Sequence, residues 1–306
     1  MMGMSLIDFS QQNEKAIYDL FKSSLILKRN FNNYSLSQVQ VKGIAYLLFF
    51  EPSTRTRFSF ESACARSGVH PIVLSSAVGT SLEKGETMED TVFNLDALRP
   101  LFFVIRCPDE LDLAALAKEI KTPIFNAGWG WKGHPTQALL DALTLFERWE
   151  TLRDKKLLFV GDIKHSRVVS SHLELAKICG YKIGYCAPKY FLPSEVEGIE
   201  VFTNINEGLK WSDAVCALRV QKERHFDVDV RQGFEVDLYK MDFGINQKSL
   251  GNLKSDGVIL HPGPINYGIE IEKEILKDPR SVILKLVENG MFIRQAIVQN
   301  FLNGKT

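Results

Sequence analysis

The chain lacks several features that would assign it to common classes of protein. Its 306 residues carry 37 basic and 37 acidic side chains, so the formal net charge is zero. No apolar run is long enough to span a bilayer. These absences argue against a broad nucleic-acid-binding or membrane-binding surface, so any basic site must be local.

Cysteine is also scarce. There are five cysteines, an odd number, and no two of them form a Cys-x-x-Cys pair. Most of them lie in apolar segments, so we expect buried free thiols and neither disulfides nor zinc ligands. Residues 1–15 contain neither a basic leader nor a long apolar core, so we expect a cytoplasmic protein.

A dinucleotide-binding string is missing as well. The predicted strand 156–160 is followed by Gly161-Asp162, and no Gly-x-Gly-x-x-Gly string occurs there. We therefore expect no dinucleotide cofactor there.

What the chain does contain is apolar strands that alternate with amphipathic helices, which is typical of an α/β protein with parallel sheets. The length favours two domains, and the charged segment 150–155 is the predicted boundary. The predicted strands are 44–50, 71–74, 101–105, 122–125, 156–160, 182–186, 214–218 and 258–260. A last helix is predicted over 281–301.

The helix that follows strand 44–50 lacks an acidic residue in its first turn. Ser53 can cap this helix, but Arg55 and Arg57 stand where a cation opposes the helix dipole by roughly 0.3–1 kcal/mol. Together with the hydroxyl groups of Ser53, Thr54 and Thr56, the free N–H groups of this turn suit a phosphate. The alternative is a capped helix with two solvated arginines.

The string Ser53-Thr-Arg-Thr-Arg57, preceded by Phe49-Phe-Glu51, resembles the carbamoyl-phosphate motif of the aspartate and ornithine transcarbamoylases. Four further strings resemble motifs of the same family in the same order, and the resemblance covers nearly the whole chain. The first is Ser81 to Thr87, in which Lys84 precedes Gly-Glu-Thr, and the second is His134-Pro-Thr-Gln137. The third combines Gly161-Asp-x-x-x-x-Arg167 and Arg219-Val-Gln221, and the fourth is His261-Pro-Gly-Pro264.

The resemblance implies two doubly wound parallel-sheet domains linked by helices, the aspartate/ornithine carbamoyltransferase fold. It implies a carbamoyl-phosphate-binding domain over 1–149 and an aspartate-binding domain over 150–280. The C-terminal helix, within 281–306, is expected to pack back on the first domain.

The resemblance also implies the residues that bind carbamoyl phosphate. His134 would donate to the carbamoyl oxygen, and Gln137 would hold the carbamoyl NH₂ group. Arg106 ends a predicted strand, where open α/β sheets hold their ligands. The full expected set is Ser53, Thr54, Arg55, Thr56, Ser81, Lys84, Arg106, His134 and Gln137, with Arg55, Thr56, Lys84, Arg106 and His134 as catalytic residues.

The loop with Ser81 and Lys84 would be read as a solvated connection from its polarity alone. In the family, a corresponding loop reaches into the active site of the neighbouring subunit. The resemblance therefore implies a homotrimer with shared active sites.

The second substrate is expected to be L-aspartate. A dicarboxylate needs two forked cations, and Arg167 and Arg219 would pair with its α-carboxylate and side-chain carboxylate. The full expected set is Lys84, Arg167, Arg219, Gln221, Pro262 and Gly263. Glu51 lies beside the expected phosphate site and is predicted to bridge to Arg167 or Arg224 when the domains close.

The expected reaction is carbamoyl transfer from carbamoyl phosphate to L-aspartate, an early step of pyrimidine biosynthesis. This reaction needs no covalent nucleophile, metal ion or organic cofactor, and none is expected. Two alternatives stay open. One is an ornithine transcarbamoylase, against which Arg219-Val-Gln221 and the absence of a His-Cys-Leu-Pro string argue. The other is a non-catalytic homologue that serves as a scaffold for a regulatory chain or a dihydroorotase, although none of the expected phosphate and carbonyl ligands is missing.

Overall fold

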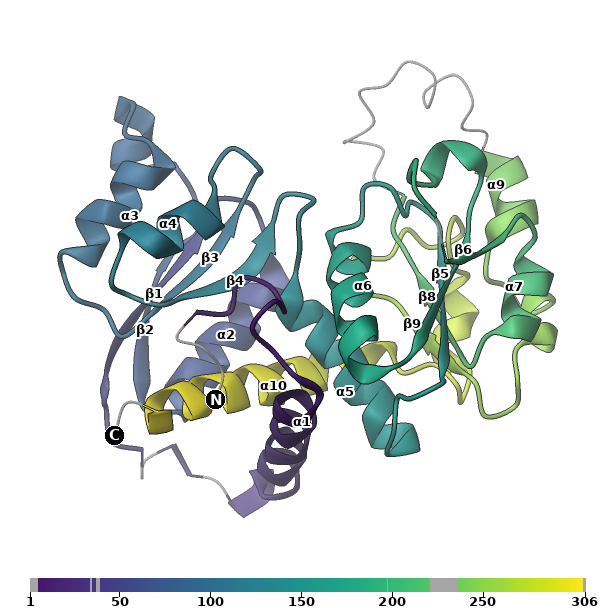
Figure 1. Cartoon of the computed structure of the whole chain (residues 1–306), viewed down its shortest axis with the longest axis horizontal. Coiled ribbons are helices and arrows are strands. Elements are labelled where there is room, and N and C mark those ends of the chain that lie inside the picture. The colour runs from purple at the N-terminus through teal and green to yellow at the C-terminus, as the bar shows by residue number, and fades with distance from the viewer. Residues whose placement is uncertain (1–4, 34, 37–38, 197, 221–235, 305–306) are drawn as a thin grey trace. The chain divides into compact units, whose positions relative to one another are not determined.

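The computed structural model of the chain describes residues 5–33, 35–36, 39–196, 198–220 and 236–304 (Figure 1). The chain divides into two compact units. Unit 1 contains the chain up to Leu143, Ser170–Ile178 and the chain from Val287 onward, and unit 2 contains Thr144–Val169 and Cys179–Leu286. Helices α5, α6 and α10 contribute residues to both units.

Unit 1 is built around a parallel sheet with the strand order β2-β1-β3-β4. The strands are β1 (Gly43–Phe49), β2 (Val69–Leu74), β3 (Phe103–Cys107) and β4 (Ile124–Trp129). The helices that contribute to this unit are α1 (Glu14–Arg29), α2 (Thr54–Arg66), α3 (Met88–Asp96), α4 (Leu113–Glu119), α5 (Pro135–Trp149), α6 (Arg167–Cys179) and α10 (Ile283–Gly304).

Helices cover both faces of this sheet. Helices α3 and α4 lie on one face, and their apolar side chains form one buried cluster with those of β1, β3 and β4 (Figure 1). The opposite side holds α2, whose residues Phe60, Ala63 and Cys64 are buried, as is its C-cap residue Ser67. Because both faces are covered, the strands are apolar along most of their length, which is why their continuous apolar runs were readable from sequence.

Unit 2 is built around a second parallel sheet with the order β7-β6-β5-β8-β9. Helix α6 begins on one face of this sheet, and α7 and α9 lie on the other (Figure 1). The elements are β5 (Lys156–Val160), β6 (Lys182–Cys186), β7 (Glu200–Phe202), α7 (Ile205–Trp211), β8 (Ala214–Ala217), α9 (Val236–Phe243) and β9 (Val258–Leu260).

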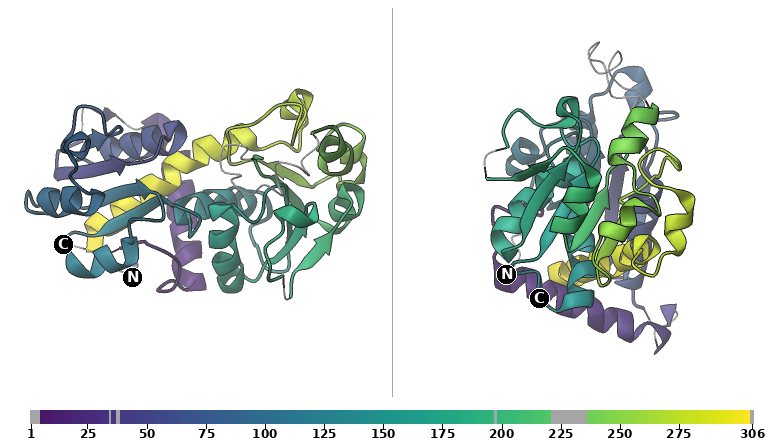
Figure 2. Two further views of the ribbon diagram at one scale, coloured as in Figure 1. Left: turned by 90° about the horizontal axis from the view of Figure 1, so that it is seen from above. Right: turned by 90° about the vertical axis from the view of Figure 1, so that its right-hand side faces the viewer.

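The C-terminal helix α10 is one long continuous helix, drawn in yellow in Figure 2. From Val287 onward it belongs to unit 1. There Phe301 packs edge-on against Phe102 and Phe125, with ring centroids 5.4 and 5.7 Å apart. These contacts hold the C-terminal part of α10 against the first sheet.

Most predicted elements are present, and β5, β6 and β9 have the predicted bounds. The predicted bounds were wrong for β4, which begins at Ile124 and continues to Trp129, whereas a strand over 122–125 was predicted. The chain turns after this strand, where the Trp129 N–H donates to the Gly133 carbonyl over 2.9 Å. The short elements β7 and α7 were not predicted at all.

The five cysteines are free and buried, as predicted. Among the described residues, every helix is too short or too polar to span a bilayer.

Candidate active site

Each sheet has one point at which the strand order reverses, and open α/β sheets bind ligands at the carboxyl ends of the strands there. In unit 1 this point lies between β1 and β3, where Phe49 pairs with Arg106. The pairing continues one step beyond β1, because the Phe50 N–H donates to the Arg106 carbonyl over 2.9 Å. The Ser53 to Arg57 motif and Arg106 thus meet at the reversal point of the first sheet.

The first turn of α2 leaves its N–H groups available. Ser53 is the N-cap residue, but its side chain makes no capping hydrogen bond, and the first turn contains no acidic residue. The two arginines differ: Nε of Arg57 lies 3.1 Å from Oε1 of Glu61, whereas Arg55 is exposed and has no carboxylate partner among the described residues. Arg55 is therefore the cation that this turn offers to an anion. Thr56 is buried.

Arg106 and Glu51 lie beside each other at the same edge of the sheet. Nε of Arg106 is 3.6 Å from Oε2 of Glu51, and Nη1 is 3.5 Å from the Ala127 carbonyl. The Glu51 carboxylate thus neighbours a cation of its own unit. The predicted bridge from Glu51 to Arg167 or Arg224 stays a prediction, and Arg224 lies outside the described residues.

The start of α5 holds the second predicted motif of unit 1. His134 precedes Pro135, and its side chain is 4 % exposed. The His134 backbone N–H donates to Oγ of Ser171 over 2.8 Å, and one turn further on Nε2 of Gln137 donates to Oδ1 of Asp141 over 2.9 Å. The orientation of this helix start is therefore fixed by side chains of α5 itself and of α6.

The loop between β2 and α3 carries the last predicted residues of this unit. Ser81–Lys84 form a single 3₁₀ turn that ends at Gly85, whose φ of 93° favours glycine. Ser81 and Lys84 are exposed. Within the described residues no carboxylate pairs with Lys84.

In unit 2 the strand order reverses between β5 and β8, where Val160 pairs with Ala217. Gly161 follows β5 with a φ of 116°, and a Cβ atom there would meet the Leu218 carbonyl at 2.8 Å. This glycine lets the loop after β5 approach the end of β8 closely. The two predicted arginines leave from these two strand ends: Arg167 begins α6, and Arg219 follows β8.

Helix α6 repeats the charge pattern of α2. It begins with Arg167, and no acidic residue lies in its first turn. In the loop before it, Asp162 and His165 form a buried pair with Oδ1 and Nδ1 2.7 Å apart. Gln221, the third predicted aspartate ligand from this part of the chain, lies outside the described residues.

The loop after β9 is held by a buried carboxylate. His261 and Glu270 are both buried, with Nε2 and Oε1 3.2 Å apart. Nδ1 of His261 accepts from the Gly263 N–H over 2.8 Å, and Gly263 has a φ of 68°. Oε1 of Glu270 also accepts from the Asn266 N–H over 2.6 Å. These bonds position the backbone of Pro262 and Gly263, the segment predicted to face the substrates.

Sequence reasoning missed a group of buried polar residues behind the predicted ligands. Glu270 is one, and Asp141, Ser171, His172 and Arg294 form the others in unit 1. Only Asp141 left a local signal, since it is a carboxylate four residues after Gln137 on an otherwise apolar part of the helix.

Two family models together cover most of the chain. One, described as the carbamoyl-P binding domain of aspartate/ornithine carbamoyltransferase, matches residues 4–147. The other, described as the Asp/Orn binding domain, matches residues 153–300. The chain belongs to the aspartate/ornithine carbamoyltransferase family.

Curated relatives of this chain are named aspartate carbamoyltransferase catalytic subunit. The one from Christiangramia forsetii is 41% identical over 253 residues, which cover 82% of this chain and 80% of the relative. The one from Lawsonia intracellularis is 34% identical over 303 residues, which cover 97% and 94%.

Solved structures agree with this assignment. Aspartate transcarbamoylase from Trypanosoma cruzi, in complex with N-(phosphonacetyl)-L-aspartic acid, has a TM-score of 0.86 at 30% identity and covers 96% of this chain and 94% of its own. Ornithine carbamoyltransferase from Thermus thermophilus has a TM-score of 0.82 at 27% identity, with 99% and 100% covered. The predicted fold is thereby confirmed.

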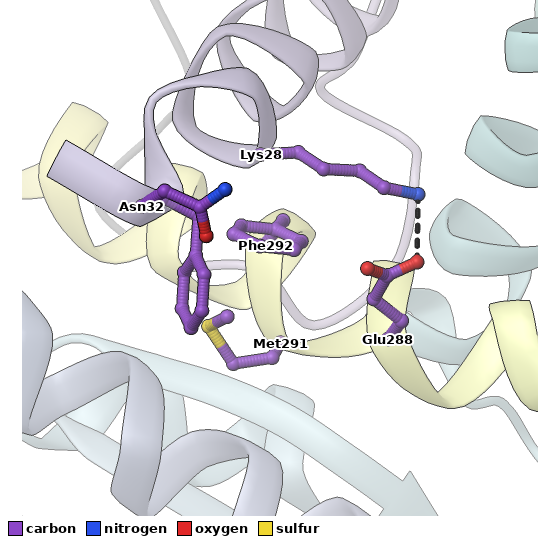
Figure 3. A pocket seen from close by; sticks show the side chains of 6 residues that line it. Lys28, Asn32, Glu288, Met291 and Phe292 are labelled. Carbon is purple, nitrogen blue, oxygen red and sulfur yellow. Dashed lines mark ion pairs between the residues drawn. The ribbon is translucent and has the colours of Figure 1, made fainter. Parts of the chain in front are cut away.

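A pocket of about 320 Å³ lies elsewhere in unit 1, and none of the predicted site residues lines it (Figure 3). Nζ of Lys28 and Oε2 of Glu288 form an ion pair of 2.9 Å at its edge. Its lining residues come from α1, from α10 and from the turn after α1: Lys28, Phe31, Asn32, Glu288, Met291 and Phe292.

Proposed function

We propose that this chain transfers the carbamoyl group of carbamoyl phosphate to the amino group of L-aspartate, giving N-carbamoyl-L-aspartate and phosphate. One observation carries the proposal: the reversal point of each sheet has a helix that begins with a cation and without an acid, Arg55 in α2 and Arg167 in α6. Two such anion sites in one chain suit two anionic substrates.

The domain assignment follows the same logic. Residues 1–149, with the C-terminal helix in 281–306, would hold carbamoyl phosphate, and residues 150–280 would hold aspartate. The family models meet between residues 147 and 153, which supports a boundary in this region.

In the proposed site the phosphate group binds at the first turn of α2. Ser53, Thr54 and Thr56 contribute N–H and hydroxyl donors, and Arg55 contributes a guanidinium group that can form two parallel hydrogen bonds. Lys84 adds a further cation, and Ser81 adds a hydroxyl donor. Phosphate carries two negative charges at neutral pH, so these donors and cations match its demand.

The carbamoyl group would lie against Arg106 and the start of α5. Thr56, Arg106 and His134 donate to its carbonyl oxygen, and Gln137 accepts from its NH₂ group. Attack by the aspartate amine makes a tetrahedral intermediate whose oxygen carries a full negative charge. Donors aimed at that oxygen lower the barrier more than they stabilise the bound substrate.

Aspartate would bind through its two carboxylates. Arg167 takes the α-carboxylate and Arg219, with Gln221, takes the side-chain carboxylate, while Lys84 and the backbone of Pro262 and Gly263 orient the amine. The C–N bond forms first, and collapse of the tetrahedral intermediate then breaks the C–O bond to phosphate. The departing phosphate takes the amine proton, so no side-chain base is required.

The proposed assembly is a cytoplasmic homotrimer in which Lys84 enters the site of the neighbouring chain. A regulatory chain or a dihydroorotase would be a further partner. The relatives' name, catalytic subunit, denotes one part of an assembly, which supports an oligomer.

The test is phosphate release from carbamoyl phosphate by the purified chain, with L-aspartate, L-ornithine or no amine added. Release that depends on aspartate alone supports both the reaction and the roles of Arg167 and Arg219. Release that depends on ornithine would overturn the assignment of the second substrate. No release with either amine would favour a non-catalytic scaffold.

A further inference from the structure

Asp141 is a buried carboxylate in the middle of α5. Its side chain is 1 % exposed, and its helical neighbours Ala138, Leu139 and Ala142 are buried apolar residues. Burying a carboxylate is costly unless hydrogen bonds replace its lost water. An apolar residue would fill this position better if the position served packing alone. The role of Asp141 must therefore lie in the hydrogen bonds that its carboxyl group forms.

Both carboxylate oxygens of Asp141 are engaged. Oδ1 accepts from Nε2 of Gln137 over 2.9 Å, and Oδ2 lies 3.3 Å from Nε2 of His172. His172 is 1 % exposed and comes from α6. The adjacent Ser171 accepts from the His134 N–H over 2.8 Å, so two consecutive residues of α6 contact the start and the second turn of α5.

The contact with Asp141 decides which way the Gln137 amide faces. Oδ1 of Asp141 acts as an acceptor here, so the NH₂ end of Gln137 faces it. The other end, Oε1, then points away, and it has no hydrogen-bond partner among the described residues. An amide turned by 180° would instead present a donor on that side.

Several groups face the Asp141 carboxyl group and offset part of the cost of burying it. Burial raises the pKa of this carboxyl group, and hydrogen bonds from His172 and Gln137 and the charge of Arg294 oppose that shift without reversing it. Arg294 is itself buried and belongs to α10. Three elements of unit 1 thus contribute groups that stabilise a negative charge at this position.

We propose that Asp141 is a positioning residue for carbamoyl transfer: it fixes the amide of Gln137 so that Oε1 accepts from the carbamoyl NH₂ group, and His172 holds the second oxygen of Asp141 in place. This inference rests on the proposed function. The nitrogen lone pair of the carbamoyl group is delocalised into the carbonyl, so this NH₂ group can donate but accepts poorly. An acceptor at Gln137 therefore suits it, and a donor would repel it.

The test is a double-mutant cycle on Gln137 and Asp141. Four forms of the full chain are compared: wild type, Asp141→Ala, Gln137→Ala and the double variant. The measured quantities are kcat and KM for carbamoyl phosphate at saturating aspartate, and the inhibition constant of inorganic phosphate. Asp112→Ala is the matched control, because Asp112 caps α4 in the same unit through the Ala114 and Ala115 N–H groups and is exposed.

We expect Asp141→Ala to lower kcat/KM for carbamoyl phosphate about 10-fold or more in the wild-type background, and less than about 2-fold in the Gln137→Ala background. The inhibition constant of phosphate should change less than about 2-fold, because phosphate does not use Gln137. Asp112→Ala should leave kcat/KM within about 2-fold of wild type.

Equal losses from Asp141→Ala in both backgrounds would overturn the proposal, because a merely structural role gives additive effects. If Asp141→Ala does not fold, Asp141→Asn replaces it in the same cycle. Asparagine can present either end of its amide to Gln137, so a smaller loss is expected, again confined to the background that retains Gln137. A wild-type chain that releases no phosphate with any amine would reject the proposed function itself, whereas an active wild type with additive losses rejects this inference alone.

Discussion

Nη2 of Arg294 lies 3.2 Å from Oγ1 of Thr136, and both side chains are buried. The same guanidinium group donates from Nη1 to Oγ of Ser59 over 2.9 Å and lies over the Phe60 ring. Ser59 and Phe60 belong to α2 and Thr136 to α5. One arginine of the C-terminal helix therefore joins the two helices that carry the proposed carbamoyl-phosphate ligands.

We expect Arg294→Met to lower the free energy of unfolding of the chain by roughly 2–4 kcal/mol, because the hydroxyl groups of Ser59 and Thr136 lose their donor and the buried Asp141 carboxyl group loses a nearby cation. The kcat value should fall as well, since α2 and α5 lose their shared anchor. Urea unfolding and phosphate-release kinetics measure the two effects. Arg29→Met is the control: Arg29 is exposed on α1, and a change within about 0.5 kcal/mol is expected there. A stability loss equal to that of the control would contradict the role assigned to Arg294.

The two arginines of the α2 motif should differ in function. Arg55 has no carboxylate partner among the described residues, whereas Arg57 is paired with Glu61. We expect Arg55→Ala to lower kcat/KM for carbamoyl phosphate about 100-fold or more, and Arg57→Ala to lower it less than about 10-fold. Steady-state kinetics at varied carbamoyl phosphate concentrations measure kcat/KM for both variants. Similar losses in both variants would mean that Arg57 leaves Glu61 and binds the phosphate too.

The proposed sharing of sites between chains predicts complementation. Lys84→Ala and His134→Ala should each be nearly inactive alone. After subunit exchange, a site built from Lys84 of one chain and His134 of another forms again in about a quarter of the positions of an equimolar trimer mixture. The carbamoyl-transfer activity of the exchanged mixture measures the fraction of re-formed sites. If exchange is verified by mass and no activity returns, each site is built from one chain.

The buried Glu270 should affect aspartate more than carbamoyl phosphate. Glu270→Ala removes the acceptor for the Asn266 N–H and the contact with His261, which in turn orients the Gly263 N–H. We expect KM for aspartate to rise about 10-fold while KM for carbamoyl phosphate changes less than about 2-fold. Glu272→Ala is the matched control, since Glu272 is exposed in the same segment. A parallel rise of both KM values would indicate general damage to the fold.

The cysteines should be unreactive in the native chain. Burial raises the pKa of both Cys64 and Cys186 to about 12, and all five thiols are buried. The thiolate is the reactive form and appears only as the pH rises toward the pKa, so at pH 8 only about one such thiol in 10⁴ is ionised. A disulfide reagent such as DTNB should label none of them at pH 8 and all five after unfolding in guanidinium chloride. Rapid labelling of a native thiol would show that its segment opens.

Much of the fold could be predicted because patterns among neighbouring residues determine it. The strands β6 and β9 are short apolar runs between turn residues, and α2 begins after a residue of N-cap type and carries a regular apolar stripe. The missed elements lack such patterns: β7 has three residues, two of them exposed, and α7 has seven. The extra length of β4 comes from pairing with β3 across an irregular register. The glycine-rich sequence of this segment does not indicate such pairing.

The sequence by itself determined the ligand types and their order along the chain, because cations and hydroxyl groups at strand ends follow directly from residue identity. Only the tertiary structure decided which of these groups are fixed by hydrogen bonds, and which remote residues form those bonds. Arg294 and Thr136 are 158 residues apart, and His172 reaches Asp141 from another helix. Hydrogen bonds between remote residues leave no periodic pattern in the sequence, since their geometry arises only when the helices pack.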